Sequence, residues 1–149
     1  MADKRRFEFF AHFLVETFGE ARGVFDIAGG MGRLNLALGE LGRECTTFDV
    51  RHKRLPKISY AERLFTLDEP CTAQLVVGMH ADGATRLIIE YAGRHRIPFA
   101  VVPCCSDNGM PYKPWMRHLA EVAREQRLTA EESTLPMEGR ARVLFGRPA

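Results

Sequence analysis

The sequence has no long apolar segment, few cysteines and almost no excess of charge of either sign. Its longest apolar runs, QLVVGM and FAVVP among them, are far shorter than the roughly 20 residues that a membrane-spanning helix needs. The 21 basic and 19 acidic residues give a net charge of +2, so neither DNA nor a membrane is an expected partner. A hydrophobic content of 46% over 149 residues predicts one soluble globular domain, residues 1–149.

The four cysteines form no CxxC pair, and Cys104 is followed directly by Cys105, which is poor geometry for a bridge between them. We therefore expect reduced thiols and a cytoplasmic setting. The N-terminal segment, residues 1–23, is basic and aromatic, but charged residues interrupt it at helical spacing and no small-residue cleavage site follows. It predicts an amphipathic helix rather than a signal peptide, with a buried face made of Phe9, Phe10, Phe13, Leu14 and Phe18.

Apolar periodicity predicts strands that alternate with helices along most of the chain. The predicted strands cover residues 24–28, 46–50, 74–79, 98–105, 127–133 and 140–146. The predicted helices after the N-terminal one cover residues 33–42, 82–96 and 113–126. Residues 51–72 are compatible with either a further strand or a helical turn, and are too short for a full helix together with a full strand.

This alternation predicts an α/β fold: a three-layer α-β-α sandwich, Rossmann-like, around a mostly parallel sheet of six or seven strands. Connections between its parallel strands should be right-handed. No helix separates the last two strands, so one strand near the C-terminus is expected to run antiparallel.

The segment VFDIAGGMGRL places a glycine-rich turn between a strand and a helix, where backbone N–H groups can approach a ligand closely. A dinucleotide fingerprint, GxGxxG, would need a third glycine where Asn35 stands. Asp26, inside the strand, would also repel a pyrophosphate. Both residues argue against a nicotinamide-dependent oxidoreductase.

The same segment resembles the first motif of class I S-adenosylmethionine-dependent methyltransferases, and FDV resembles the acidic end of their second strand. In that family the first acid lies near the methionine ammonium of the cofactor, and the second-strand acid binds the ribose hydroxyls. The distance of 19 residues from Gly30 to Asp49 is close to the roughly 20 expected for a ribose-binding acid. The resemblance implies S-adenosylmethionine as cofactor, bound by Asp26, Ala28, Gly29, Gly30, Gly32, Asp49, Val50 and Met79, with adenine near Leu64 or Phe65.

The segment HADGAT follows the fourth strand of such a sheet, where the winding reverses and ligands bind. It places His80 and Asp82 across the crevice from the glycine turn. No NPPY-like motif occurs there, which argues against methylation of adenine or glutamine nitrogens. HADGAT together with VPCC resembles a less characterised branch of methyltransferase-like proteins. His80 is a candidate catalytic base that Asp82 would orient; alternatively, His80 hydrogen-bonds the backbone and Asp82 caps the next helix.

Cys104 and Cys105 end the fifth strand and resemble the nucleophilic position of some RNA cytosine C5 methyltransferases. Those enzymes also carry a PC motif on the fourth strand, which this chain lacks. The alternatives are that these cysteines are small buried hydrophobes, or, less favoured, zinc ligands with His80 and Asp82.

Two basic clusters, residues 4–6 and 51–54, would meet phosphates if they border the crevice, with Tyr112 and Trp115 as stacking surfaces; otherwise they are a solvated face. The resulting hypothesis is a methyltransferase of the EC 2.1.1 class acting on RNA or a small molecule, with or without a partner protein. The alternative is a non-catalytic methyltransferase-like module that binds the cofactor or a partner.

Overall fold

The computed structural model describes residues 3–106 and 108–149. Its elements follow the predicted alternation of strands and helices. In chain order they are α1 (Arg6–Thr17), β1 (Gly23–Ile27), α2 (Arg33–Glu40), β2 (Glu44–Asp49), β3 (Ser59–Glu62), β4 (Leu75–Met79), α3 (Thr85–His95), β5 (Phe99–Val102), α4 (Tyr112–Glu125), β6 (Glu131–Thr134) and β7 (Arg142–Gly146).

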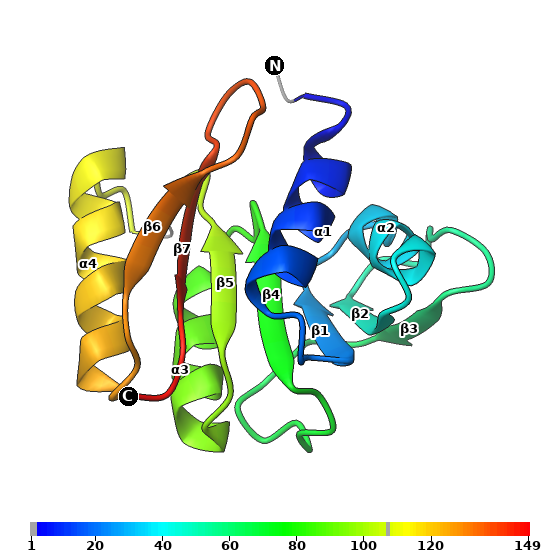
Figure 1. Cartoon of the computed structure of the whole chain (residues 1–149), viewed down its shortest axis with the longest axis horizontal. Helices are drawn as coiled ribbons and strands as arrows, with labels where there is room; N and C mark the ends of the chain where they lie inside the picture. The colour runs from blue at the N-terminus through cyan, green and yellow to red at the C-terminus, as the bar shows by residue number, and fades with distance from the viewer. Residues whose placement is uncertain (1–2, 107) are drawn as a thin grey trace.

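The strands form one seven-stranded sheet in the order β3-β2-β1-β4-β5-β7-β6 (Figure 1). Strands β1 to β5 pair in parallel, whereas β7 runs antiparallel to both of its neighbours. This confirms the predicted mixed sheet and its antiparallel strand near the C-terminus. Because β1 lies between β2 and β4, the winding reverses beside β1, where a crevice forms in sheets of this kind.

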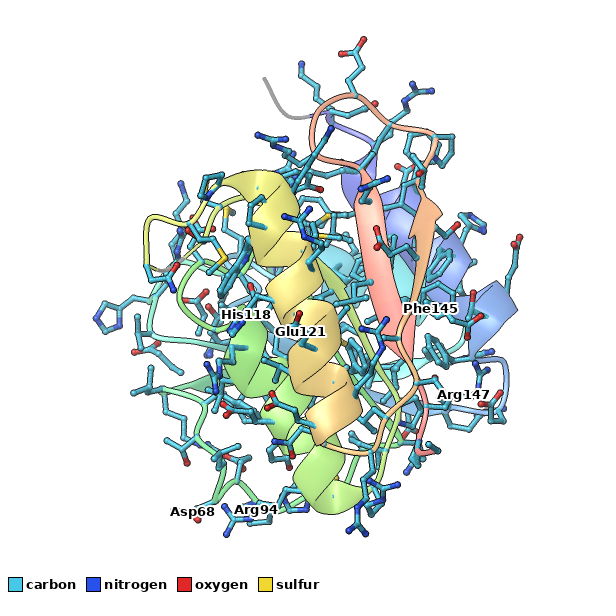
Figure 2. The ribbon with its side chains drawn as sticks, turned by 90° about the vertical axis from the view of Figure 1, so that its left-hand side faces the viewer. Asp68, Arg94, His118, Glu121, Phe145 and Arg147 are labelled. Carbon is cyan, nitrogen blue, oxygen red and sulfur yellow. The ribbon has the colours of Figure 1, made fainter. Side chains whose placement is uncertain are left out.

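Helices cover both faces of the sheet. The helices α3 and α4 bury one apolar cluster against one face, and α1 and α2 bury a second apolar cluster against the other. Figure 2 shows α3 and α4 on one side of β6 and β7, and α1 on the other. Within α1, Phe10 and Leu14 are buried as predicted, but Phe9 and Phe13 are only half-buried, which corrects that part of the prediction. The Phe13 ring meets the edge of Phe145 on β7, with the ring centroids 5.2 Å apart.

Residues 50–74 contain the short strand β3 and no helix. The strand interpretation of this segment is therefore correct, and β3 becomes an edge strand connected to its neighbours by loops. None of the described helices combines the length and apolarity that crossing a bilayer requires.

Candidate functional site

The turn between β1 and α2 lies at the carboxyl end of the parallel strands. Figure 1 shows the start of α1 at this same end of the sheet. Gly32 precedes α2 with φ of 95°, a left-handed conformation that favours glycine. At Gly29 the requirement is space, because a Cβ atom there would overlap the carboxylate of Asp26 and lie 2.7 Å from Cγ2 of Thr47. The glycines therefore let the turn fold directly onto the ends of β1 and β2.

Two side chains hold Gly30 from the neighbouring strands. The Gly30 N–H donates to Oδ2 of Asp49 at 2.8 Å, and the hydroxyl of Tyr60 donates to the Gly30 carbonyl at 2.6 Å. Sequence reasoning identified Asp49 but missed Tyr60, since residues 51–72 were not assigned to a strand. The parallel pairing of β2 and β3, with Thr47 opposite Tyr60, is what brings this ring beside the turn.

Asp26 is the most buried acid of the site, with 1% of its surface exposed. Burial raises the pKa of its carboxyl to about 7, the nearby charge of Asp49 adds to this rise, and a hydrogen bond from Thr47 opposes it. Oγ1 of Thr47 donates to Oδ2 of Asp26 at 2.9 Å. The carboxyl is thus close to half-ionised at neutral pH, and a cation beside it would favour its charged form.

Asn35 supports this arrangement from α2. Its buried Nδ2 lies 3.1 Å from Oγ1 of Thr47, 3.0 Å from the carbonyl of Cys45 and 2.9 Å from the carbonyl of Ser59. The residue that breaks the dinucleotide fingerprint therefore links α2 to both β2 and β3. A glycine at this position would lose all three contacts.

Two cavities open on either side of Ala28. The first, which we call the apolar cavity, has a volume of about 310 Å³ and lies between the end of β2 and the start of α3. Phe48, Phe65 and Leu87 give it apolar walls, with the Asp49 carboxyl group at its border. Of the residues predicted from the sequence, it is lined by Ala28, Asp49, Val50, Leu64, Phe65 and Asp82.

The second, which we call the arginine cavity, has a volume of about 300 Å³ and lies between the glycine turn and the start of α1. Arg6, Arg33 and Arg51 line it. The sequence offered Arg6 and Arg51 as residues that could border the crevice, but did not point to Arg33. Of the residues predicted from the sequence, it is lined by Asp26, Ala28, Gly29, Gly30, Met79 and His80. Gly32 lines neither cavity; its contribution is the left-handed backbone conformation that lets the turn lead into α2.

His80 follows β4 with φ of 53°, an unusual backbone conformation for a residue other than glycine. Its Nε2 lies 3.2 Å from the carbonyl oxygen of Arg140, in the loop between β6 and β7. Because a carbonyl can only accept a hydrogen bond, Nε2 carries the proton, and a neutral ring leaves Nδ1 available as a base. The predicted backbone hydrogen bond of His80 is therefore present, and it is compatible with the predicted role as a base.

Asp82 lines the apolar cavity, while His80 lines the other one. No side-chain hydrogen bond joins them within the described residues, so the structure shows no orienting contact, and the role of Asp82 in orienting His80 stays a prediction. The capping alternative is wrong: Ala84 precedes α3, and no side chain caps the helix. Instead, Thr85 bonds back to the carbonyl of Ala81 at 3.1 Å.

Cys104 and Cys105 lie beyond the end of β5 with their sulfur atoms 3.7 Å apart, and line neither of the two cavities. Cys104 is half-buried and Cys105 exposed, so the expectation of two buried hydrophobes is incorrect. Partial burial raises the pKa of Cys104, which makes its thiolate scarcer. Among the described residues no group of three or more histidine, cysteine or acidic side chains could hold a metal, which excludes the zinc alternative there.

The basic clusters separate in the structure. Arg6 and Arg51 line the arginine cavity, whereas the remaining members of residues 4–6 and 51–54 do not. Trp115 is 1% exposed and belongs to the core, so it cannot serve as a stacking surface. The ring of Tyr112 is covered by Arg140, whose guanidinium carbon lies 3.8 Å from the ring centroid.

Comparison of the sequence finds no matching family model and no matching curated protein. Solved structures do match. Magnesium protoporphyrin IX methyltransferase from Synechocystis, with bound S-adenosylmethionine, superposes with a TM-score of 0.71 at 10% identity, over 97% of this chain and 79% of that one. The 1,6-didemethyltoxoflavin-N1-methyltransferase of Burkholderia thailandensis, with bound S-adenosylhomocysteine, superposes with a TM-score of 0.66 at 16% identity. That alignment covers 99% of this chain and 80% of that one.

This chain has the class I methyltransferase fold. A further match is an O-methyltransferase family protein from Burkholderia thailandensis, with a TM-score of 0.65 at 18% identity. The alignment covers 94% of this chain but only 55% of that one, so the chain spans about half the length of this relative. The likeness shows the fold, and the role of the site rests on its own residues.

Proposed function

We propose that the protein is an S-adenosylmethionine-dependent methyltransferase. One observation carries this proposal: the buried Asp26, the glycine turn and Asp49 converge where two cavities of contrasting character meet at Ala28. S-adenosylmethionine has matching ends, with an aromatic base and a ribose diol at one and an ammonium group at the other. The proposal covers residues 1–149 as one domain and places it in the branch suggested by HADGAT and VPCC.

The apolar cavity fits the adenosine part of the cofactor. Phe48, Phe65 and Leu87 offer apolar surface to a flat base. Asp49 already accepts hydrogen bonds from the backbone N–H groups of Gly30 and Arg51, at 2.8 and 3.2 Å. An ionised carboxylate has about four acceptor positions, so Asp49 retains the capacity to bind ribose hydroxyls.

The arginine cavity fits the methionine part. Asp26 would face the ammonium group, and one guanidinium would pair with the carboxylate. When bound there, the cofactor supplies an electrophilic methyl group on a sulfonium. The residues of the chain supply orientation, which accounts for much of the rate in such a displacement. Where the acceptor must lose a proton, Nδ1 of His80 would take it.

A proton-accepting His80 does not require the cysteines, and we assign Cys104 and Cys105 no covalent step. The acceptor would be a small molecule, as in the 1,6-didemethyltoxoflavin enzyme, with RNA or a protein-presented acceptor as the alternatives. All four cysteines are free thiols, which supports the reducing cytoplasm as the proposed location.

The decisive experiment is calorimetric titration with S-adenosylmethionine and S-adenosylhomocysteine. We expect Asp49→Ala to weaken binding about tenfold or more, because a charged hydrogen bond contributes about 1.5–3 kcal/mol. The matched control is Asp68→Ala. Figure 2 shows Asp68 and Arg94 at the opposite end of the molecule, and Asp68 pairs there with Arg94 at 3.6 Å. Absence of binding to either compound would refute the proposal.

The second candidate is a non-catalytic module that binds the cofactor. It is favoured by the helix-free segment of residues 50–74, which leaves little structure to recognise an acceptor. Turnover of S-adenosylmethionine with any acceptor, lost in His80→Ala while cofactor binding persists, would exclude this candidate.

A further inference from the structure

The arginine cavity carries more positive charge than the methionine part of a cofactor can neutralise. Arg6 comes from α1, Arg33 from the start of α2, and Arg51 from the loop after β2. Among the described residues that line this cavity, Asp26 is the only acid. If Asp26 faces an ammonium group and one guanidinium faces a carboxylate, two guanidinium groups still lack an anion.

The interactions of the three arginines show which of them are free to bind. Arg51 is partly committed, with Nε 3.9 Å from Oδ1 of Asp49. Arg6 donates from Nη1 to the carbonyl of Asp3 at 3.1 Å, a neutral partner that leaves its charge uncompensated. Arg33 is exposed, and no hydrogen bond or ion pair joins its guanidinium group to another described residue. Arg51, whose contact with Asp49 is long, is therefore the guanidinium left for the carboxylate of the cofactor. Arg6 and Arg33 are the two that have no carboxylate partner among the described residues.

The surroundings strengthen this positive field. No side chain caps the start of α2, directly beside Arg33, so the N–H groups of the first turn keep their partial positive charge.

His80 lines the same cavity. A molecule whose anionic group lies against Arg6 and Arg33 would thus occupy the cavity that also holds the proposed base.

We propose that the arginine cavity binds an oxyanion, a carboxylate or phosphate, of a small methyl acceptor through Arg6 and Arg33. This inference rests on the proposed function and deepens it by naming the substrate class. Guanidinium groups suit such anions, because their planar donors match two oxygens at once. The anionic group anchors the acceptor in the cavity that contains His80.

The test uses the whole chain saturated with S-adenosylhomocysteine and inorganic phosphate as the probe, titrated by calorimetry at constant ionic strength. We expect phosphate to bind with a dissociation constant of about 1 mM. Arg33→Gln and Arg6→Gln should each weaken it about fivefold or more. The matched control, Arg94→Gln, removes an exposed arginine at the opposite end of the molecule and should leave phosphate binding unchanged.

The preceding titration with S-adenosylhomocysteine alone decides the proposed function, so the two results are distinguishable. Phosphate that binds only the unloaded protein would mean that the arginines serve the carboxylate of the cofactor, and would overturn the inference. Failure of phosphate to bind, or equal binding by wild type and Arg33→Gln, would also overturn it. An RNA oligonucleotide that displaces phosphate with steep salt dependence would overturn the assignment to a small acceptor.

Discussion

The apolar cavity and the arginine cavity share Ala28 as a wall, yet they are built from opposite kinds of residue. The first is formed mainly by aromatic and aliphatic side chains from β2, the segment after β3 and α3. The second combines three guanidinium groups and the glycine turn with Asp26, His80 and a few apolar side chains. The glycine turn and the end of β1 thus separate two cavities with different binding preferences. The apolar cavity favours a ligand group by its shape, and the arginine cavity favours one by its charge.

This difference predicts different responses to pH. The walls of the apolar cavity come mostly from groups without charge, whereas the arginine cavity contains an acid whose pKa lies near 7. Substitutions at the shared wall should affect both cavities, and substitutions of Asp26 should affect the arginine cavity alone.

The largest effect is expected from Gly29→Ala. The new Cβ would lie 2.6 Å from Cγ of Asp26 and 2.7 Å from Cγ2 of Thr47, so the turn must move away from both strands. We expect the free energy of unfolding to fall by about 2 kcal/mol or more. Affinity for S-adenosylhomocysteine should fall about 30-fold or more, since the backbone between both cavities is displaced.

Gly39→Ala is the control for this change. Gly39 lies in α2, and nothing lies within 4 Å of the Cβ it would gain. Alanine favours a helix, so this variant should be stabilised by up to about 1 kcal/mol and bind normally. Normal binding by Gly29→Ala would show that the turn does not shape the cavities.

A smaller effect, with a distinctive pH dependence, is expected from Asp26→Asn. The folded-state pKa of Asp26 is about 7 against an ordinary value of 3.8, so the folded state holds a proton that the unfolded chain releases. This contribution to stability is complete below about pH 4 and is lost as the pH rises through 7. A shift of this size corresponds to at most about 4 kcal/mol. Because the amide replaces one carboxyl oxygen with an N–H donor, we expect Asp26→Asn to exceed wild type in stability by about half of this at pH 8, and to lose the advantage toward pH 4.

Binding should show the opposite dependence. If an ammonium group pairs with ionised Asp26, the affinity of wild type for S-adenosylhomocysteine should rise about tenfold from pH 6 to pH 8. Asp26→Asn should flatten this profile, while Asp49→Ala should lower affinity and retain the slope. Denaturant titrations and calorimetry across this pH range measure both quantities. An Asp26→Asn profile as steep as that of wild type would separate Asp26 from cofactor binding.

The smallest effect is expected from Ala28→Gly. Ala28 has φ of 54°, a conformation that costs an L-residue about 1–2 kcal/mol and glycine almost nothing. Glycine is also more flexible than alanine in the unfolded chain, which offsets part of this benefit. We therefore expect the free energy of unfolding, measured by thermal unfolding, to rise by about 0.5 kcal/mol. The control Ala37→Gly, in the middle of α2, should lose about 1 kcal/mol. A loss in both variants would show that the methyl group of Ala28 outweighs its backbone strain.

The sequence predicted the fold well, because alternating elements and short connections determine a parallel sheet with little ambiguity. It also predicted that Asp26 and Asp49 lie beside the glycine turn, since Asp26 and Asn35 argue against a pyrophosphate-binding turn and Asp49 ends the next strand. These are local features, carried by residues close together in the chain. The structure adds their mutual geometry, including the hydrogen bond from Gly30 to Asp49.

Contacts between distant segments were not predictable in this way. Tyr60 reaches Gly30 only because β3 pairs with β2, and a short strand between loops gives little periodicity to recognise. Arg6 and Arg33 line the same cavity because α1 packs beside α2 at the carboxyl end of the sheet. The capping role expected for Asp82 failed for a local reason instead, since α3 begins after Ala84.

The contacts of Asn35 have a consequence for how little chain this site needs. One amide group reaches the carbonyl of Cys45 on β2 and that of Ser59 on β3, so a polar anchor replaces the apolar packing that another helix would supply. Helix α2 thereby helps to determine the position of the edge strand β3, and of Tyr60 upon it. Together with the backbone pairing of β3 and β2, this one amide lets a short edge strand hold Tyr60 beside the glycine turn without a helix of its own.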